Sequence, residues 1–329
     1  MKVEVLGGFE GLDERRWNGL VERSSSRSVF LTWQWQTAWT RAFGAGRPLQ
    51  ILTVIDADGS LAGILPLYEE TDGRWRIVGG EDVSDYLDLI AAPGAEAAVW
   101  EALLQHRAGP PAVWELRGVR PDSVMLTTLP SLAAAYGLRA DAEVEERCPV
   151  LPLPATWDEY LSRLSGKDRH ELRRKMRKLE AELPGVTLRQ HADAEGWDRA
   201  MSDFLTLHRA SRVGKARFMD ERMERFFRGA LRDLAAAGWA RLWFLDWDGA
   251  PIATFICVEY ADAVGLYNSG FDPAQAKRAP GIVLLGHVIM DAIARRFVVF
   301  DFLRGEEPYK YSFGPAPRDL FRVRLHPAP

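Results

Sequence analysis

The segment FDFLRGEEPYKYSFG, residues 300–314, concentrates side chains that can move protons. Asp301 and Glu307 offer carboxylates, Tyr309 a phenol and Lys310 an ammonium group, directly after the apolar run FVVF. Polar groups this dense on a loop that follows a buried strand are typical of a site presented by a rigid scaffold. Carboxylates and tyrosine serve as general base and general acid when their surroundings adjust their pKa. The alternative is a surface loop held by salt bridges.

A second segment, GFDPAQAKRAPGIVLL (270–285), runs from a predicted strand into a predicted helix. Lys277 and Arg278 precede Pro280 and Gly281, and proline suits the first turn of a helix. The free N–H groups of that turn, the helix dipole and the two cations together suit a diphosphate. No P-loop or GxGxxG pattern is present, which argues against nucleotide chemistry of those kinds. Ordinary helix initiation explains the same residues without a ligand.

The densest charge lies in RLSGKDRHELRRKMRK (163–178), which holds eight Lys or Arg against two acidic residues. Arg169, Arg173 and Arg177 recur every four residues and therefore share one face of a predicted helix. Like charges at this spacing repel, so the face is suited to an anionic partner such as a phosphate-rich cofactor, a tRNA backbone or a glycan phosphate. A solvated face, partly neutralised by its acidic neighbours, is an equally good interpretation.

Polar residues in two other places could bind a substrate. His208 and Arg212 lie one turn apart on a predicted helix, with Lys215 just beyond it, while Asp85 and Tyr86 stand at the entrance of a predicted strand. No Gly-x-Ser-x-Gly elbow and no Cys-His pair supports a covalent nucleophile. Direct transfer between two bound substrates fits these residues better.

Composition sets the frame for these segments. A chain of 329 residues with 47% apolar and 27% charged residues is a folded protein with two domains. The net charge of -4 argues against DNA and against wholesale binding to anionic membranes. Cys148 and Cys257 have no partner at a metal-ligand spacing, so neither zinc nor a disulfide framework is expected. The sequence has no apolar run long enough for a membrane span and no signal peptide, which predicts a cytoplasmic protein.

The elements that must position these residues occur twice. A meander of strands over 49–55, 61–68 and 74–79 is followed by a helix and a strand ending in Leu-Arg-Gly. A second meander over 241–247, 251–260 and 263–271 is followed by a helix from residue 280 and a strand over 297–305. The turns at Asp58-Gly59 and Asp248-Gly249 are 190 residues apart, and the two Leu-Arg-Gly ends 187. Two similar modules are predicted, divided near residue 150 by the proline-punctuated CPVLPLP.

Several motifs together resemble a known family. FLTWQWQTAWTRAFG, SDYLDLI, the basic LSGKDRHELRRKMRKLE, LHRASRVGKARF, WDGAPIATF, SGFDPAQAKRAPGIVLL and FDFLRGEEPYKYSFG span nearly the whole chain. In this order they resemble the CelD-type or BioF2-like acyltransferases of the GNAT superfamily. The two-module plan also resembles the Fem-type peptidyltransferases, whose two halves are each GNAT-like.

The resemblance implies an α+β fold of tandem GNAT-like modules, each a mixed, mostly antiparallel sheet flanked by helices. The modules would be residues 1–150 and 151–329, the second with a helical insertion over 156–238 and an acyl-donor groove. It further implies direct acyl transfer from acetyl-CoA or another acyl-CoA to a cell-envelope carbohydrate or related small acceptor, without a metal.

The resemblance also assigns roles to residues. Glu307 or Asp301 would be the base, Tyr309 the acid or oxyanion donor and Lys310 a charge partner. The remaining candidates bind the coenzyme A diphosphate (Lys277, Arg278, Ala279, Gly281 and Ile282) or the acceptor (Asp85, Tyr86, His208, Arg212, Lys215 and Arg304).

Two other functions stay open at this point. The basic stretch 163–178 would suit an aminoacyl-tRNA-dependent transferase of the Fem type. AKRAPGIV has a single glycine where the superfamily pattern has Gly-x-Gly or Gly-x-Ala, so a non-catalytic scaffold in polysaccharide biosynthesis is the third possibility.

Overall fold

The computed structural model describes residues 1–80, 82–106, 113–193 and 195–328. They divide into two compact units, the first made of residues 1–146 and the C-terminal residues from Asp319 on, the second of Arg147–Arg318. The chain enters the second unit within strand β7 (Leu138–Pro152) and returns within β13 (Ala316–Pro327). The second module was expected over residues 151–329, whereas Asp319 and the residues after it group with the first unit.

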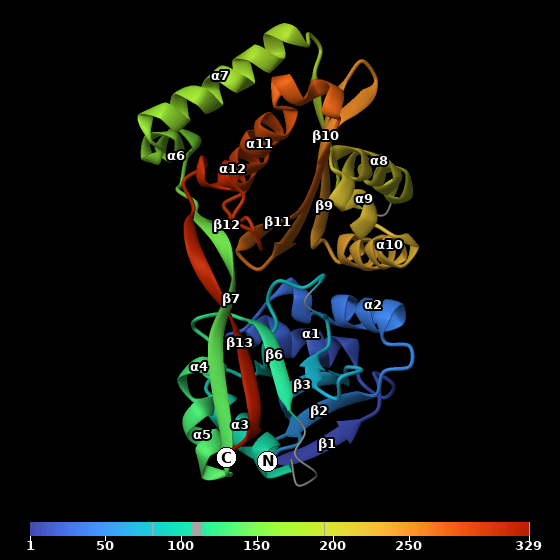
Figure 1. The fold of residues 1–329 in the computed structure, drawn as a ribbon, viewed down its shortest axis with the longest axis vertical. Coiled ribbons are helices and arrows are strands. Elements are labelled where there is room, and N and C mark those ends of the chain that lie inside the picture. Colours follow the sequence, from blue (N-terminus) through green and yellow to red (C-terminus); the bar gives the residue numbers. More distant parts are fainter. Residues whose placement is uncertain (81, 107–112, 194, 329) are drawn as a thin grey trace. The chain divides into compact units, whose positions relative to one another are not determined.

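The first unit is a sheet with the strand order β1-β2-β3-β4-β6-β13-β7, in which β4 and β6 are parallel. Along the chain, helices α1 and α2 come between β1 and β2, which pair directly with each other, and α3 comes between β5 and β6. Figure 1 shows the unit in blue to green, with β13 in red. The remaining bounds are β1 Lys2–Leu6, α1 Glu14–Arg23, α2 Trp33–Phe43, β2 Leu49–Ile55, β3 Leu61–Glu69, β4 Trp75–Ile77, β5 Ile90–Ala91, α3 Glu96–His106, β6 Trp114–Val119, α4 Val124–Thr127 and α5 Leu129–Ala135.

The second unit has the strand order β7-β12-β11-β10-β9-β8, in which β11 and β12 are parallel and the other pairs antiparallel. Helices α8 and α10 cover one face of β9–β11 and α11 the other, with α7 packed on α11 (Figure 1). The bounds are α6 Trp157–Arg163, α7 Gly166–Glu182, β8 Thr187–His191, α8 Trp197–Ser211, α9 Val213–Phe218, α10 Glu221–Ala236, β9 Ala240–Trp247, β10 Ala250–Tyr260, β11 Ala263–Phe271, a 3-10 turn Pro273–Arg278, α11 Pro280–Ala294, β12 Val299–Asp301 and α12 Pro308–Tyr311.

The two units repeat one order of elements. In each, an edge strand is followed by helices, a three-strand antiparallel meander, a further helix and a strand that pairs in parallel with the last strand of the meander. The meander turns lie where the Asp-Gly pairs predicted them, and Gly59 and Gly249 both have the positive φ that such turns require. The predicted α+β class with mixed, mostly antiparallel sheets is confirmed.

Two predicted segments differ from the structure. The strand expected over 297–305 is limited to Val299–Asp301, because Leu303 and Gly305 have positive φ and turn the chain away. The proline-punctuated residues 148–152, which suit either an exposed connection or an edge strand, are part of strand β7, and residues 150–152 pair with β12. The stretch 156–238, expected as a helical insertion, also contains β8, which pairs with β9.

The core of the second unit fixes the elements around the candidate site. Leu266, Val283, Leu284, Phe300 and Phe302 belong to one cluster of buried side chains that joins β11, α11 and β12. None of the helices among the described residues is long and apolar enough to cross a membrane.

Candidate active site

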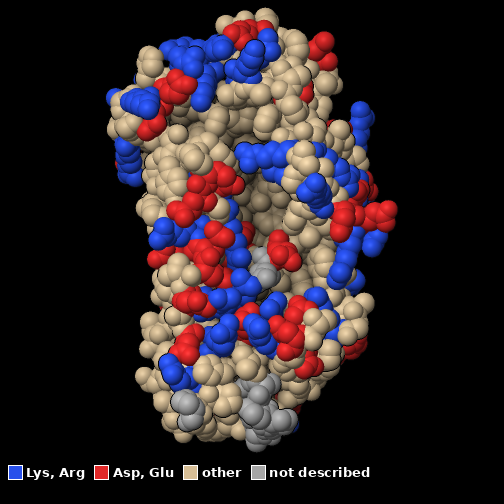
Figure 2. All heavy atoms as spheres, viewed as in Figure 1, with Lys and Arg blue, Asp and Glu red and all other residues tan. Residues whose placement is uncertain are grey.

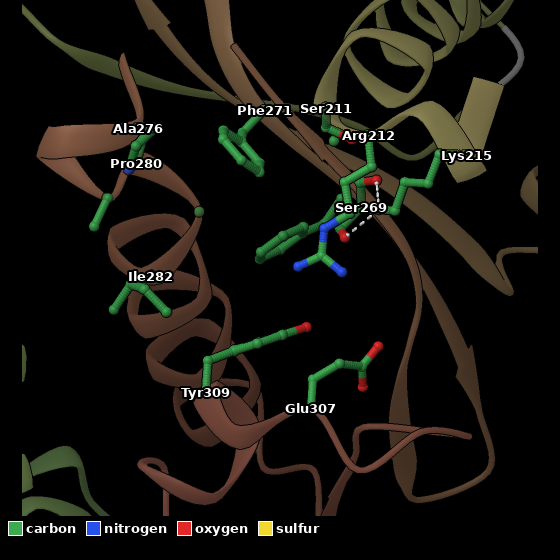
Figure 3. A pocket seen from close by; sticks show the side chains of 14 residues that line it. Ser211, Arg212, Lys215, Ser269, Phe271, Ala276, Pro280, Ile282, Glu307 and Tyr309 are labelled. Atoms are coloured by element: carbon green, nitrogen blue, oxygen red, sulfur yellow. Dashed lines mark hydrogen bonds between the residues drawn. The ribbon is translucent and has the colours of Figure 1, made fainter. Parts of the chain in front are cut away.

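A pocket of about 250 Å³ opens in the second unit between α9, β11, α11 and α12 (Figure 3). One side is mainly apolar and belongs to β11 and the N-terminus of α11, while the other is polar and belongs to the α8–α9 junction and the start of α12. The lining residues are Ser211, Arg212, Lys215, Phe255, Ser269, Gly270, Phe271, Ala276, Ala279, Pro280, Gly281, Ile282, Glu307 and Tyr309.

The pocket lies where two parallel strands part. β11 and β12 pair only from Ala263↔Val299 to Gly265↔Asp301, after which β12 ends and β11 continues to Phe271. The carbonyl of Ser269 points away from β10, because it accepts hydrogen bonds from side chains of α8 and α9. Phe271, two residues on, has the same orientation, so its backbone N–H also points to the open side. The parting therefore leaves backbone donors of β11 beside the pocket.

Gly270 lets helix α8 lie directly against β11. A Cβ at this position would be 2.5 Å from the backbone N of His208 and 2.7 Å from the carbonyl carbon of Leu207. Backbone atoms cannot move aside as a flexible side chain can, so only glycine fits here. This close approach brings the C-terminal end of α8, and with it Arg212, to the pocket.

Lys215 on α9 is anchored to the strand. Its Nζ donates hydrogen bonds to the carbonyl oxygen of Ser269 at 2.5 Å and to the Oγ of Ser269 at 3.0 Å. Burial and then the charge of Arg212 lower the pKa of Lys215 to about 8. This amine is thus partly neutral near pH 8.

His208 on α8 donates a hydrogen bond to the same carbonyl oxygen of Ser269. It is buried, stacks on Phe204 and places Nδ1 at 3.1 Å from the Ser269 oxygen, so Nδ1 carries the hydrogen and donates it. Burial lowers the pKa of His208 to about 4, which keeps the ring neutral. His208 therefore positions β11 and does not line the pocket.

Lys310 holds the loop that carries Glu307. It is 4% exposed, and its Nζ donates to the carbonyl oxygens of Phe302 at 3.0 Å, Arg304 at 2.8 Å and Gly305 at 2.9 Å. The same Nζ pairs with Oε2 of Glu307 at 2.9 Å. Burial raises the pKa of Glu307, but the interaction with Lys310 outweighs it and leaves the pKa below its usual value. Glu307 is a carboxylate at neutral pH.

Tyr309 directs its hydroxyl toward the polar side of the pocket (Figure 3). Burial is the main cause that raises its pKa, so the phenol keeps its proton at neutral pH. A protonated phenol beside a carboxylate gives the pocket one proton donor and one proton acceptor.

Helix α11 begins at the far side of the pocket. Ala279 has φ of 51° and ψ of 50°, and Pro280 occupies the first helical position, as predicted from the sequence. No side chain caps this end, and a Cβ on Gly281 would meet no atom within 4 Å. Lys277 is exposed and makes no hydrogen bond or ion pair within the described residues. The uncapped end of a fifteen-residue helix therefore borders open space.

Seven of the predicted site residues line this pocket. They are Arg212, Lys215, Ala279, Gly281, Ile282, Glu307 and Tyr309.

The other predicted residues lie elsewhere. Asp301 is buried and its Oδ2 accepts a hydrogen bond from Arg318 at 2.6 Å, while Arg278 pairs with Glu182 of α7 at 3.2 Å. Lys277, His208, Arg304 and Lys310 are in the second unit but outside the lining. Asp85 and Tyr86 belong to the first unit, where the Tyr86 ring packs 6.3 Å from that of Phe30.

Four further lining residues have no role predicted from the sequence, namely Ser211, Phe255, Ser269 and Phe271. Ser269 stands two residues before the end of β11 and next to Gly270, and this pattern marks a strand that another backbone approaches. Within the described residues, no group of three or more His, Cys, Asp or Glu could hold a metal ion.

The residues around this pocket match the model of a known protein family. Residues 166–311, which include every lining residue, match the model of the acetyltransferase (GNAT) domain. No curated protein matches the sequence.

Solved structures share the fold over nearly the whole chain. The crystal structure of FemX is similar with a TM-score of 0.65 and 11% identity, over 98% of this chain and 97% of that one. A conserved protein of unknown function from Bacteroides thetaiotaomicron gives 0.67 and 11%, over 99% and 100%. The C-terminal domain of a putative lysylphosphatidylglycerol synthetase from Agrobacterium fabrum gives 0.61 and 11%, over 94% and 90%. At such identities these similarities show the fold alone.

Residues 166–311 thus match a GNAT acetyltransferase domain, and the chain is an enzyme that transfers acyl groups.

Proposed function

We propose that this enzyme transfers an acyl group directly from acyl-CoA to an amine or hydroxyl of a small acceptor. The observation that carries the proposal is the pocket at the parting of β11 and β12, with the uncapped start of α11 on one side and Glu307 and Tyr309 on the other. A donor and an acceptor can enter from these two sides and meet beside β11.

The donor would lie along the start of α11. Backbone N–H groups at a helix N-terminus, together with the helix dipole, stabilise a diphosphate. Gly281 leaves room for the ligand to approach that backbone, and Lys277 is an exposed cation one turn before it. The N–H of Phe271 would hydrogen-bond to the thioester oxygen as negative charge develops on it.

The acid and base would come from the loop and helix that follow β12. The Glu307 carboxylate takes a proton from the amine or hydroxyl of the acceptor while the lone pair of that amine or hydroxyl attacks the thioester carbon. The bond from carbon to sulfur then breaks, and the Tyr309 hydroxyl protonates the leaving thiolate. We prefer Glu307 to Asp301 as the base because Glu307 lines the pocket, whereas Asp301 is paired with Arg318.

The acceptor and the setting rest on the resemblance to the CelD-type and BioF2-like enzymes. We propose that the acceptor is a cell-envelope carbohydrate or a related small molecule, acylated in the cytoplasm.

We also propose that the two units are two related modules, since they repeat one order of elements and one parallel strand pair.

Calorimetric titration with acetyl-CoA and longer acyl-CoA esters tests the donor. We expect saturable heat and a thermal shift with at least one of these esters and a weaker response to coenzyme A alone. No heat and no thermal shift with any ester would refute the proposal.

A second candidate is transfer from aminoacyl-tRNA, and the surface of α7 favours it. Lys and Arg side chains gather over α7 at the top of the view in Figure 2. Among the described residues, Lys167, Arg173 and Arg177 make no hydrogen bond or ion pair, so their charges are available to a phosphate backbone. The double variant Arg173→Glu, Arg177→Glu should abolish tRNA binding at low salt; unchanged binding, or none by the wild type, excludes this candidate.

A further inference from the structure

The polar side of the pocket holds more positive than negative charge. Arg212, Lys215 and Glu307 line it, and the single carboxylate among them is already paired with Lys310 at 2.9 Å. Lys310 is 4% exposed and held by three carbonyl oxygens, so it cannot leave Glu307 easily. Among the described residues, neither Arg212 nor Lys215 forms an ion pair with a carboxylate, and the charge of Glu307, which acts on both, is shared with Lys310.

Arg212 is aimed at the pocket without a partner. It links α8 to α9, and its guanidinium points between Ser269 and the pair Glu307 and Tyr309 (Figure 3). In the described part of the chain its side chain makes no hydrogen bond and no ion pair. A guanidinium offers five donors in a planar fork that matches a carboxylate or a phosphate.

Lys215 strengthens the preference of this side of the pocket for an anion. It uses two of its three N–H donors on Ser269, so one donor remains. Two cations this close repel each other, and an anion between them would relieve that repulsion. The α11 N-terminus, where the donor diphosphate would lie, is on the opposite side of the pocket (Figure 3). The Arg212 position is thus a separate anion site.

We infer that the acceptor carries a small oxyanion, a carboxylate or a phosphate monoester, which the Arg212 guanidinium binds with help from Lys215. This inference rests on the proposed function, because it names the class of acceptor that the same pocket takes.

The binding arm of the test needs no turnover. The Nε–H resonance of Arg212 is followed by NMR while inorganic phosphate, and separately acetate, is added at constant ionic strength. We expect a saturable shift that is absent in Arg212→Gln and kept in Arg217→Gln, since Arg217 is exposed on α9, the helix that follows Arg212, and does not line the pocket. No saturable shift with either anion, or a loss in Arg217→Gln as well, would overturn the inference.

The kinetic arm compares matched acceptors with acetyl-CoA as donor. Glucosamine 6-phosphate is set against glucosamine, and glycine against glycinamide, so that the two sources of oxyanion are distinguished. Arg212→Gln should raise KM for the charged member of the accepted pair by about tenfold or more, because it removes hydrogen bonds between charged groups, and leave the KM of acetyl-CoA unchanged. A KM effect on acetyl-CoA alone would assign Arg212 to the donor and overturn the inference.

The two failures can be told apart. If acetyl-CoA binds and the anions do not, the inference is wrong and the proposed function stands. If the anions bind at Arg212 and no acyl-CoA ester does, the anion site stands and the proposed donor is wrong.

Discussion

Replacing Lys310 by methionine should destabilise the second unit. Lys310 is 4% exposed and donates to three carbonyl oxygens at 2.8 to 3.0 Å while it pairs with Glu307. Methionine has a similar length and no donor, so the change tests these polar contacts and not the volume. Leaving a buried polar group without its donor costs about 1–3 kcal/mol, and Glu307, whose side chain is 43% exposed, adds less than a fully buried ion-pair partner would.

The expected loss for Lys310→Met is therefore about 2–3 kcal/mol, because the buried carbonyl of Phe302 loses its donor whereas water can reach those of the half-buried Arg304 and Gly305. Urea unfolding followed by tryptophan fluorescence and circular dichroism measures it. Lys277→Met is the control, since Lys277 is exposed and the change should stay within about 0.5 kcal/mol. A loss below about 1 kcal/mol for Lys310→Met would refute the view that this lysine holds the loop.

Three further outcomes follow from the same region. His208→Asn should flatten the pH dependence of the unfolding free energy between about pH 6.5 and 4. In that window the histidine of the unfolded chain binds a proton and the buried ring of the folded protein does not. The unfolding free energy of the wild type should therefore fall by about 3 kcal/mol as the pH falls from 6.5 to 4. Equal slopes in acid titrations of the two proteins would contradict this assignment. Gly270→Ala should lower the unfolding free energy in urea by about 1–3 kcal/mol, because the added Cβ would meet the backbone of α8. Gly229→Ala, with open space around it, should be neutral or stabilising. Similar values for the two variants would be evidence against the close approach of α8 to β11. Lys215 should react with acetic anhydride at pH 8 faster than Lys277, because the pKa of Lys215 is lowered to about 8. Peptide mass spectrometry measures the labelling of each lysine, and equal labelling would contradict the lowered pKa of Lys215.

The order of elements could be predicted from the sequence because it rests on local signals. Asp-Gly turns and a Pro-Gly helix start depend on backbone preferences of single residues, and the structure has Gly59, Gly249 and Pro280 in the predicted roles. The end of β12 could not be predicted in this way. Leu303 adopts a φ of 55°, which its residue type disfavours, and the buried Lys310 holds the carbonyls on both sides of it.

The composition of the pocket was predictable only in part. Glu307, Tyr309 and Gly281 were chosen from dense or uncapped segments and do line it. Asp301 has an equally suitable side chain, but its partner Arg318 is seventeen residues away in sequence and gives no local signal. Ser269 and Phe271 were missed because their importance comes from the short pairing of β11 with β12, which is a tertiary feature.

The start of α11 gives the most direct test of the proposed donor. A leucine at Gly281 would meet no protein atom near its Cβ and is a better helix residue than glycine, so Gly281→Leu should fold normally while its side chain fills the pocket. Gly229→Leu on α10 is the matched control, with equally open surroundings and no place in the lining. The decisive measurement is the calorimetric Kd of acetyl-CoA for the wild type and both variants. We expect Gly281→Leu to weaken binding by about tenfold or more and Gly229→Leu to leave it unchanged. Equal affinity in all three proteins would contradict a donor site at this helix.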